Sequence, residues 1–220
     1  MKTQLENVLP ADIEKRSFEI ITEELGGRTF PEEIAPIVKR VIHTTADFDY
    51  ADNLVFTENV VEKAKQAIRD GACIVTDTQM ARSGINKKVL AEFGGEAFCF
   101  MSDPDVAAAA REKHTTRASC SMEKAATLDR PLIFAIGNAP TALVTLHDLI
   151  LNGVLRPRLI IGVPVGFVNV VASKELILET DVPAIVARGR KGGSNVAAAI
   201  CNALLYQMDP SRGMGKKDVR

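Results

Sequence analysis

From residue 72 onward, short runs of apolar residues alternate with longer stretches in which apolar residues recur every three or four positions. Short continuous apolar runs are typical of buried parallel strands, and longer periodic stretches are typical of amphipathic helices. The expected strands are residues 72–76, 97–101, 131–136, 158–162 and 183–187. The expected helices are residues 86–93, 104–112, 119–128, 140–152, 170–179 and 194–207. This alternation predicts a doubly wound three-layer α/β sandwich with a five-stranded parallel sheet.

The segment before the first of these strands has a helical pattern. We expect N-terminal helices over residues 12–25, 36–42 and 57–70. For the last of them, Thr57 is a suitable N-cap and Gly71 a suitable stop. An N-terminal helical segment therefore precedes the sheet.

Ser17 lies on the inward face of the first expected helix, because it falls four residues after Ile13 and three before Ile20. A hydroxyl at such a position either bonds to the carbonyl one turn earlier or faces a cavity. The spacing is compatible with both alternatives.

The length and composition of the chain indicate one domain spanning residues 1–220. The chain is 46% hydrophobic and 25% charged, which is enough for a single sizeable core. Residues 211–220 are rich in glycine and charge, and we expect them to fray. With 27 basic and 28 acidic residues, the formal net charge of −1 gives no global attraction to nucleic acid or an anionic membrane. No signal peptide or membrane span is visible, so we expect a cytoplasmic protein.

Cysteine spacing and glycine motifs argue against several classes of site. The chain has four scattered cysteines and no Cys-x-x-Cys pair, so structural zinc, redox dithiols and disulfide frameworks are not expected. The fingerprints of dinucleotide and nucleoside-triphosphate binding are also missing. We therefore expect no cofactor and no metal bound by side chains.

Loops rich in glycine, proline and small polar residues follow the expected strands. In open parallel sheets, ligands bind outside the carboxyl ends of the strands. Glycine lets the backbone approach a ligand closely and leaves N–H groups free to donate. The loops are residues 77–84, 102–104, 137–141, 163–167 and 188–194.

The last of these loops is suited to an anion. The run Gly192–Ser194 opens a helix, where free N–H groups and the helix dipole favour negative charge. Arg188, Arg190 and Lys191 add positive charge. The same residues also fit an ordinary tight turn with a serine N-cap and solvated basic side chains.

Arg117 lies just before an expected helix, in a segment that also carries His114. Its guanidinium is able to pair bidentately with a ligand carboxylate, or to form a partly exposed salt bridge to a neighbouring acid. We expect His114 to be exposed and His147, in the middle of a helix, to be structural.

His43 lies where the apolar pattern of residues 36–42 ends in a polar segment. Imidazole has an unperturbed pKa of about 6.5, so it gives or takes a proton near neutral pH. Thr44, Asp47 and Asp49 follow closely and are able to fix its tautomer or hold a ligand. A histidine at the wall of a pocket and a capping or surface histidine both fit this pattern.

Six motifs in one order carry the most specific information in the chain. They are Ile13–Phe18, Arg40–Tyr50, Asp77–Met80, Gly137–Leu143, Gly162–Val168 and Gly189–Ser194. Together they closely resemble the precorrin-8X methylmutase family, which includes the cobalt-precorrin-8 methylmutases, and the resemblance covers about residues 8 to 208. One position departs from it, because Ala172 stands where the family typically carries an acidic residue before Ser173.

The resemblance implies a flavodoxin-like fold, a homodimer and an isomerase of corrin biosynthesis. Such an enzyme moves a methyl group from C11 to C12 of precorrin-8X or its cobalt form, giving hydrogenobyrinate or cobyrinate. The family's proposed proton donor falls on His43. Ser17, Arg40 and Arg117 fall where family members line the substrate pocket. We also expect substrate binding by a further set of residues: Thr44, Arg82, Gly166, Arg188, Gly192, Gly193 and Ser194. Cobalt is then expected only inside the substrate macrocycle, and hand-over to neighbouring enzymes of the pathway is a further expectation.

A methyl shift around a conjugated macrocycle agrees with these residue types. The shift requires no nucleophile and no redox centre, whereas protonation of the ring would assist it. The acetate and propionate groups of the substrate are natural ligands for arginine. Two alternatives from other classes are a non-catalytic tetrapyrrole carrier that sequesters the product and, on fold analogy, a flavin or phosphate binder.

Overall fold

The computed structural model describes residues 6–209, so the expected fraying of residues 211–220 concerns residues outside the described range. The strands are β1 (Leu54–Phe56), β2 (Cys73–Thr76), β3 (Ala97–Phe98), β4 (Leu132–Ile136), β5 (Leu159–Gly162) and β6 (Ala184–Ala187). The helices are α1 (Ile13–Leu25), α2 (Ala35–Thr45), α3 (Tyr50–Asn53), α4 (Val60–Arg69), α5 (Gln79–Gly84), α6 (Lys87–Glu92), α7 (Pro104–Glu112), α8 (Arg117–Ala125), α9 (Pro140–Leu151), α10 (Val170–Leu178) and α11 (Ser194–Tyr206).

Within the described range, the six strands form one mostly parallel sheet in the order β1-β6-β5-β4-β2-β3. Strands β2 to β6 are parallel to one another, and each corresponds to one of the five expected strands. Four of them, β2, β4, β5 and β6, are buried along their whole length. Burial on both faces explains why their sequences are continuous apolar runs rather than alternating ones.

The expectation of a five-stranded, wholly parallel sheet is wrong at one edge. Leu54–Phe56 form an additional strand, β1, which runs antiparallel to β6 with Leu54 opposite Ala187. Arg188 donates its backbone N–H to the Asn53 carbonyl at 2.8 Å, which extends this pairing. A three-residue strand inside a helical segment has no measurable periodicity, so only its pairing with β6 defines it.

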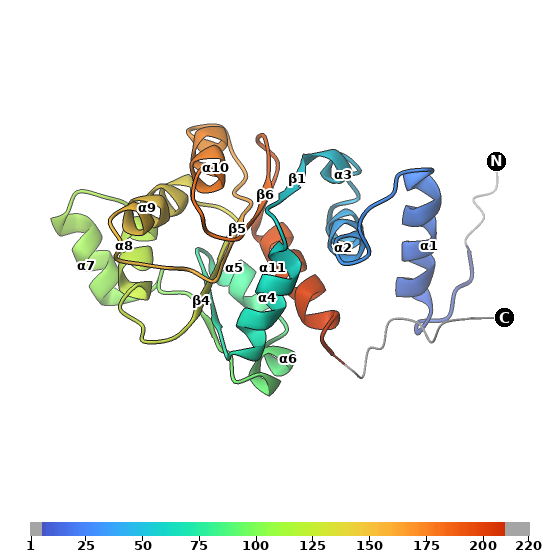
Figure 1. Cartoon of the computed structure of the whole chain (residues 1–220), viewed down its shortest axis with the longest axis horizontal. Helices are drawn as coiled ribbons and strands as arrows, with labels where there is room; N and C mark the ends of the chain where they lie inside the picture. Colours follow the sequence, from blue (N-terminus) through green and yellow to red (C-terminus); the bar gives the residue numbers. More distant parts are fainter. Residues whose placement is uncertain (1–5, 210–220) are drawn as a thin grey trace.

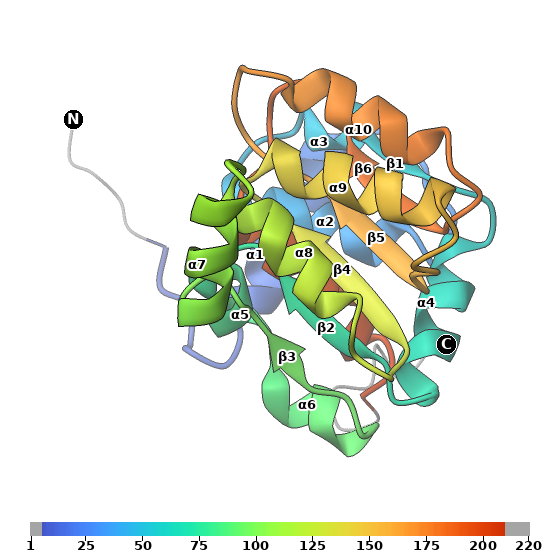
Figure 2. The same ribbon diagram turned by 90° about the vertical axis from the view of Figure 1, so that its left-hand side faces the viewer.

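Helices cover both faces of the sheet, as Figures 1 and 2 show. α7, α8, α9 and α10 lie on one face, and α2, α4, α5 and α11 lie on the other, with α1 outermost against α2 (Figure 1). Across the sheet, the five parallel strands lie in the order β3-β2-β4-β5-β6. If they are numbered 1 to 5 along the chain, this order is 2-1-3-4-5, and the connections run in opposite directions from the gap between β2 and β4. In doubly wound sheets, the crevice at such a switch point is the usual place for a ligand.

All nine expected helices are present, with shifts of up to a few residues at their ends. The expected helix 57–70 begins three residues late, because Asn59, at φ 55°, is its N-cap. The Thr57 hydroxyl instead accepts the Ala184 backbone N–H at 2.9 Å, which joins this segment to β6. Gly71, at φ 76°, ends the helix as expected. α3 and α5 are additional short helices.

Apolar clusters hold the layers together on both faces of the sheet. One joins α1, α2, α4 and α11 to the strands, and another joins α8, α9 and α10 to them. The four cysteines are free and buried, and burial raises the pKa of Cys120, which keeps its thiol protonated near neutral pH. Among residues 6–209, no helix is both long and apolar enough to cross a membrane.

Candidate active site

Asp77 follows β2 at the switch point of the sheet and is fully buried. Its carboxylate accepts the backbone N–H groups of Gly137, Asn138 and Ala139 at 2.9, 2.7 and 2.6 Å. Burial raises the pKa of this carboxyl, whereas the three N–H donors favour its ionised form. The expectation that the N–H groups of this loop are free for a ligand is therefore wrong. They fix the loop between β4 and α9 on Asp77.

Two glycines let the loop between β6 and α11 lie against the end of β5. A Cβ atom at Gly192 would lie 2.1 Å from the Val163 carbonyl oxygen, so only glycine fits there. Gly193 has a φ of 142°, which glycine adopts readily, and donates its N–H to the same oxygen at 2.9 Å. Ser194 is the first residue of α11, and its hydroxyl shares a 2.7 Å hydrogen bond with Thr78. The alternative of a serine N-cap is therefore wrong.

Two basic residues of this loop are already paired with carboxylates. Lys191 Nζ lies 2.6 Å from a carboxylate oxygen of both Asp47 and Asp49, which follow α2. These bonds lower the pKa of Asp47 and raise the pKa of Lys191. Arg188 binds both carboxylate oxygens of Glu175 at 3.1 Å. The Lys191 pairs thus join the glycine-rich loop to the end of α2.

His43 lies in the last turn of α2, because this helix runs three residues beyond the end that the pattern predicts. Thr44 and the threonine after it donate their hydroxyls to carbonyls one turn earlier, at 2.9 and 2.8 Å. Ala46, at φ 52°, then ends the helix. The His43 side chain is exposed, and its ring stacks on Phe18 of α1 with centroids 5.3 Å apart and 14° between the planes. This stacking orients the imidazole and leaves it accessible.

Arg40 lies one turn before His43 and is enclosed by three side chains. It forms an ion pair with Glu14 of α1. Its guanidinium also lies 4.7 Å from the centroid of the Phe18 ring and 5.3 Å from that of Tyr206. Phe18 therefore contacts two predicted site residues of α2, Arg40 and His43.

Three other predicted site residues lie on other helices, Ser17 on α1, Arg82 on α5 and Arg117 on α8. The Ser17 hydroxyl donates to the Ile13 carbonyl at 2.9 Å, which is the backbone alternative. Arg82 donates from Nε to the Ala97 carbonyl at 2.9 Å, near the β3 edge of the sheet. Arg117 is exposed at the first residue of α8.

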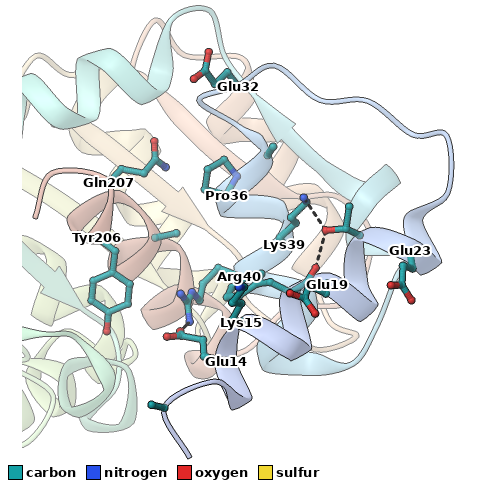
Figure 3. Close-up of a pocket in the computed structure, with 15 residues that line it drawn as sticks. Glu14, Lys15, Glu19, Glu23, Glu32, Pro36, Lys39, Arg40, Tyr206 and Gln207 are labelled. Atoms are coloured by element: carbon teal, nitrogen blue, oxygen red, sulfur yellow. Dashed lines mark hydrogen bonds and ion pairs between the residues drawn. The ribbon is translucent and has the colours of Figure 1, made fainter. Parts of the chain in front are cut away.

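A groove of about 1010 Å³ lies between α1, α2 and the end of α11 (Figure 3). Phe18 and Arg40 line this groove, but His43 does not. Its charged lining residues are Glu14, Lys15, Glu19, Glu23, Glu32, Lys39 and Arg40. Four carboxylates against three cations do not favour a polyanionic ligand along the whole groove, so only its Arg40 end is suited to a substrate carboxylate.

Apolar side chains that the sequence analysis did not single out are exposed beside the strand-end loops. Phe167, Val168 and Met80 are 80%, 79% and 70% exposed. Gly166, at φ 147°, donates its N–H to the Arg190 carbonyl at 3.1 Å, and the Arg190 guanidinium lies 5.5 Å from the Phe167 ring centroid. In the sequence, only the apolar run 163–168, which lies in a loop and includes a proline and a glycine, could have indicated Phe167 and Val168 as exposed apolar residues.

The arrangement suits acid–base chemistry on a ligand with an apolar body and anionic groups. The accessible imidazole of His43 supplies proton transfer, and the exposed arginines supply charge pairing. Exposed Met80 supplies an apolar contact for the body of the ligand. Among residues 6–209, no group of three or more His, Cys, Asp or Glu side chains is placed to hold a metal ion.

Comparisons with known proteins agree on one family. A family model described as precorrin-8X methylmutase matches residues 12–207. The chain is 47% identical to the cobalt-precorrin-8 methylmutase of Priestia megaterium over 202 residues, which are 92% of this chain and 90% of that protein. It is 36% identical over 194 residues to the precorrin-8X methylmutase of a Sinorhizobium species, covering 87% and 92% of the two chains.

A solved structure, the precorrin-8X methyl mutase from Thermus thermophilus, has the same fold. It superposes with a TM-score of 0.80 at 40% identity, covering 88% of this chain and 96% of that chain. The chain therefore belongs to the precorrin-8X methylmutase family and is a methylmutase of cobalamin biosynthesis, an intramolecular transferase.

Proposed function

We propose that the protein moves the methyl group at C11 of precorrin-8X, or of its cobalt form, to C12, with His43 as the proton donor. The C11–methyl bond breaks and the C12–methyl bond forms, so the product is an isomer of the substrate. A proton given to the macrocycle draws electron density from the migrating system and is recovered afterwards. The observation that carries the proposal is the accessible His43 ring, oriented by Phe18 at the end of α2.

The cobalt form is the better candidate substrate, giving cobyrinate. The Priestia megaterium relative, named for cobalt-precorrin-8, is 47% identical to this chain, whereas the Sinorhizobium relative, named for precorrin-8X, is 36% identical. Cobalt would then enter as part of the substrate, held by the macrocycle.

We infer that the strand-end loops, together with Arg40 of α2 and Arg117 of α8, bind the acetate and propionate groups of the substrate. Arg117 is exposed and available for such a group. Arg40 and Arg188 are already paired with Glu14 and Glu175, so a substrate carboxylate would replace those acids. Substrate binding by the remaining predicted site residues stays a prediction: Ser17, Thr44, Arg82, Gly166, Gly192, Gly193 and Ser194.

Exposed Phe167 and Val168 support a homodimer, which the family resemblance implies. Phe167 and Val168 form apolar surface that a monomer leaves in water, and a second copy would cover it. Sedimentation should then give a species of twice the chain mass, and a monomer at micromolar concentration would refute the dimer. The flavodoxin-like assignment agrees with the strand order, while cytoplasmic location and product hand-over stay predictions.

Incubation of the full chain with precorrin-8X and, separately, with cobalt-precorrin-8 tests the proposed function. A change of the visible spectrum to that of the corrin product, with unchanged molecular mass, is the expected result. A stable spectrum of bound substrate without conversion would contradict it and favour the non-catalytic carrier. Uptake of a flavin from a mixture of cofactors would favour the flavin-binding alternative.

A further inference from the structure

Lys174 is a fully buried lysine on α10 for which the proposed reaction has no use. Its ammonium donates to the backbone carbonyls of Gly189 at 2.8 Å and Lys191 at 2.9 Å. No ion pair to it occurs within the described range, and its burial lowers the pKa of the ammonium to about 8. Burying an ammonium without a carboxylate costs free energy, so the two carbonyl bonds point to a requirement for this loop geometry.

The two bonded carbonyls fix the direction of the peptide units to which they belong. In a trans peptide, the C=O and the N–H of one unit point in opposite directions. The carbonyls of Gly189 and Lys191 point inward to the ammonium. The N–H groups of the same units, those of Arg190 and Gly192, therefore point away from it. Neither N–H has a protein acceptor among residues 6–209.

The outward N–H groups lie in a setting that favours an anion. Outward N–H groups of a turn form concavities that bind anions. The exposed Arg190 side chain adds positive charge beside them. The buried ammonium lies directly behind the two peptide units.

We propose that Lys174 is a positioning residue for substrate binding, because it turns the N–H groups of Arg190 and Gly192 toward a substrate carboxylate. The inference rests on the proposed function and names a residue that acts on the substrate through the loop. A lysine that only fills the interior would change the stability of the protein and leave its affinity for carboxylates unchanged.

Lys174→Met in the full chain tests this role, because methionine keeps an unbranched side chain only one atom shorter and removes its donors. Lys63→Met, at an exposed lysine on α4, is the matched control. We expect the KM for cobalt-precorrin-8 to rise about tenfold, because the N–H groups of Arg190 and Gly192 no longer donate to the substrate carboxylate. We expect kcat to change less than about twofold, because these bonds lie away from the reacting carbons. The dissociation constant of cobyrinate should rise by the same factor, and that of its fully amidated derivative should not change.

Three outcomes overturn the inference, and a fourth refutes the proposed function on which it rests. An unchanged KM in folded Lys174→Met, or an equal loss of affinity for the amidated derivative, overturns it. If this variant does not fold, NMR of the wild type decides: the amide resonances of Arg190 and Gly192 must shift more with cobyrinate than with the amidated compound, and equal shifts overturn the inference. Absence of wild-type turnover would instead refute the proposed function.

Discussion

At the scale of single residues, two buried charges of opposite sign hold the backbone of the site. Asp77 accepts three N–H groups of the loop after β4. Lys174 donates to two carbonyls of the loop after β6. Charge-assisted hydrogen bonds to the backbone fix a loop more firmly than contacts between flexible side chains, because one end of each bond is the backbone itself.

Replacing Asp77 by alanine leaves three backbone N–H groups without an acceptor in the interior. We expect the free energy of unfolding to fall by on the order of 3 kcal/mol, since each unsatisfied buried group costs about 1–3 kcal/mol. Urea unfolding followed by far-UV circular dichroism measures the loss. Asp129→Ala, at an exposed aspartate, is the control and should stay within about 0.5 kcal/mol of the wild type. A loss below about 1 kcal/mol for Asp77→Ala would contradict the account.

Neither buried charge was recognisable from the sequence. Asp77 follows a strand, as many polar residues do, and Lys174 occupies a polar position of an expected helix. Their burial results from the packing of segments that are distant in sequence, which local periodicity does not report. Ser17 is the opposite case, because one of its two alternatives depends only on its own helix, and the structure has that one.

At the scale of elements, the end of α2 is joined to the loop before α11 by one lysine. Lys191 binds both Asp47 and Asp49, which are more than 140 positions away in sequence. The bonds hold the segment that follows His43 against the glycine-rich loop. The end of α2 and the loop before α11 are therefore expected to move together.

Lys191→Met should lower the resistance to urea at pH 7 slightly, because the pair is partly exposed. The hydrogen bond from Lys191 lowers the pKa of Asp47 below its ordinary 3.8, so its contribution is present above that pH and is lost as pH falls through the lowered value. The raised pKa of Lys191 keeps the pair charged up to about pH 10. Urea unfolding of both proteins at pH 7 and at pH 2 checks this. A difference between them that is the same at both pH values would contradict it.

The elements themselves follow the sequence pattern where burial is complete and depart from it at the edges. The buried strands were predictable because parallel strands with both faces covered are continuous apolar runs. β1 was not, because it depends on pairing with β6. α2 extends past its apolar pattern because Thr44 and Thr45 bond to the carbonyls of their own helix. The pairing of Lys191 with Asp47 and Asp49 was not predictable either, because these residues are far apart in the sequence.

At the scale of the whole molecule, charge is balanced overall and uneven locally. The formal net charge is −1, and the groove beside α1 carries more acid than base. Exposed Arg190 lies in the loop after β6, and exposed Arg117 begins α8, where the preceding Thr116 bonds to Thr141 beside the loop after β4. Local positive charge at these loops, rather than a field of the whole protein, is what attracts an anionic substrate in this account.

Salt should therefore weaken substrate binding. Raising the ionic strength from about 0.05 M to about 0.5 M shortens the range over which exposed charges interact, so we expect KM to rise several-fold with kcat nearly constant. Steady-state kinetics at both salt concentrations measures this. A KM that does not depend on salt would show that the arginines of the strand-end loops do not bind the substrate carboxylates.

The central claim is that His43 supplies the proton that assists the methyl shift. The most direct test is single-turnover conversion of cobalt-precorrin-8 by His43→Asn, with His114→Asn as the control at an exposed histidine. Asparagine is polar but transfers no proton, so the His43 variant should convert substrate about 10²–10⁴-fold more slowly while still binding product, and the control should match the wild type. A His43→Asn rate within about threefold of the wild-type rate would contradict the account.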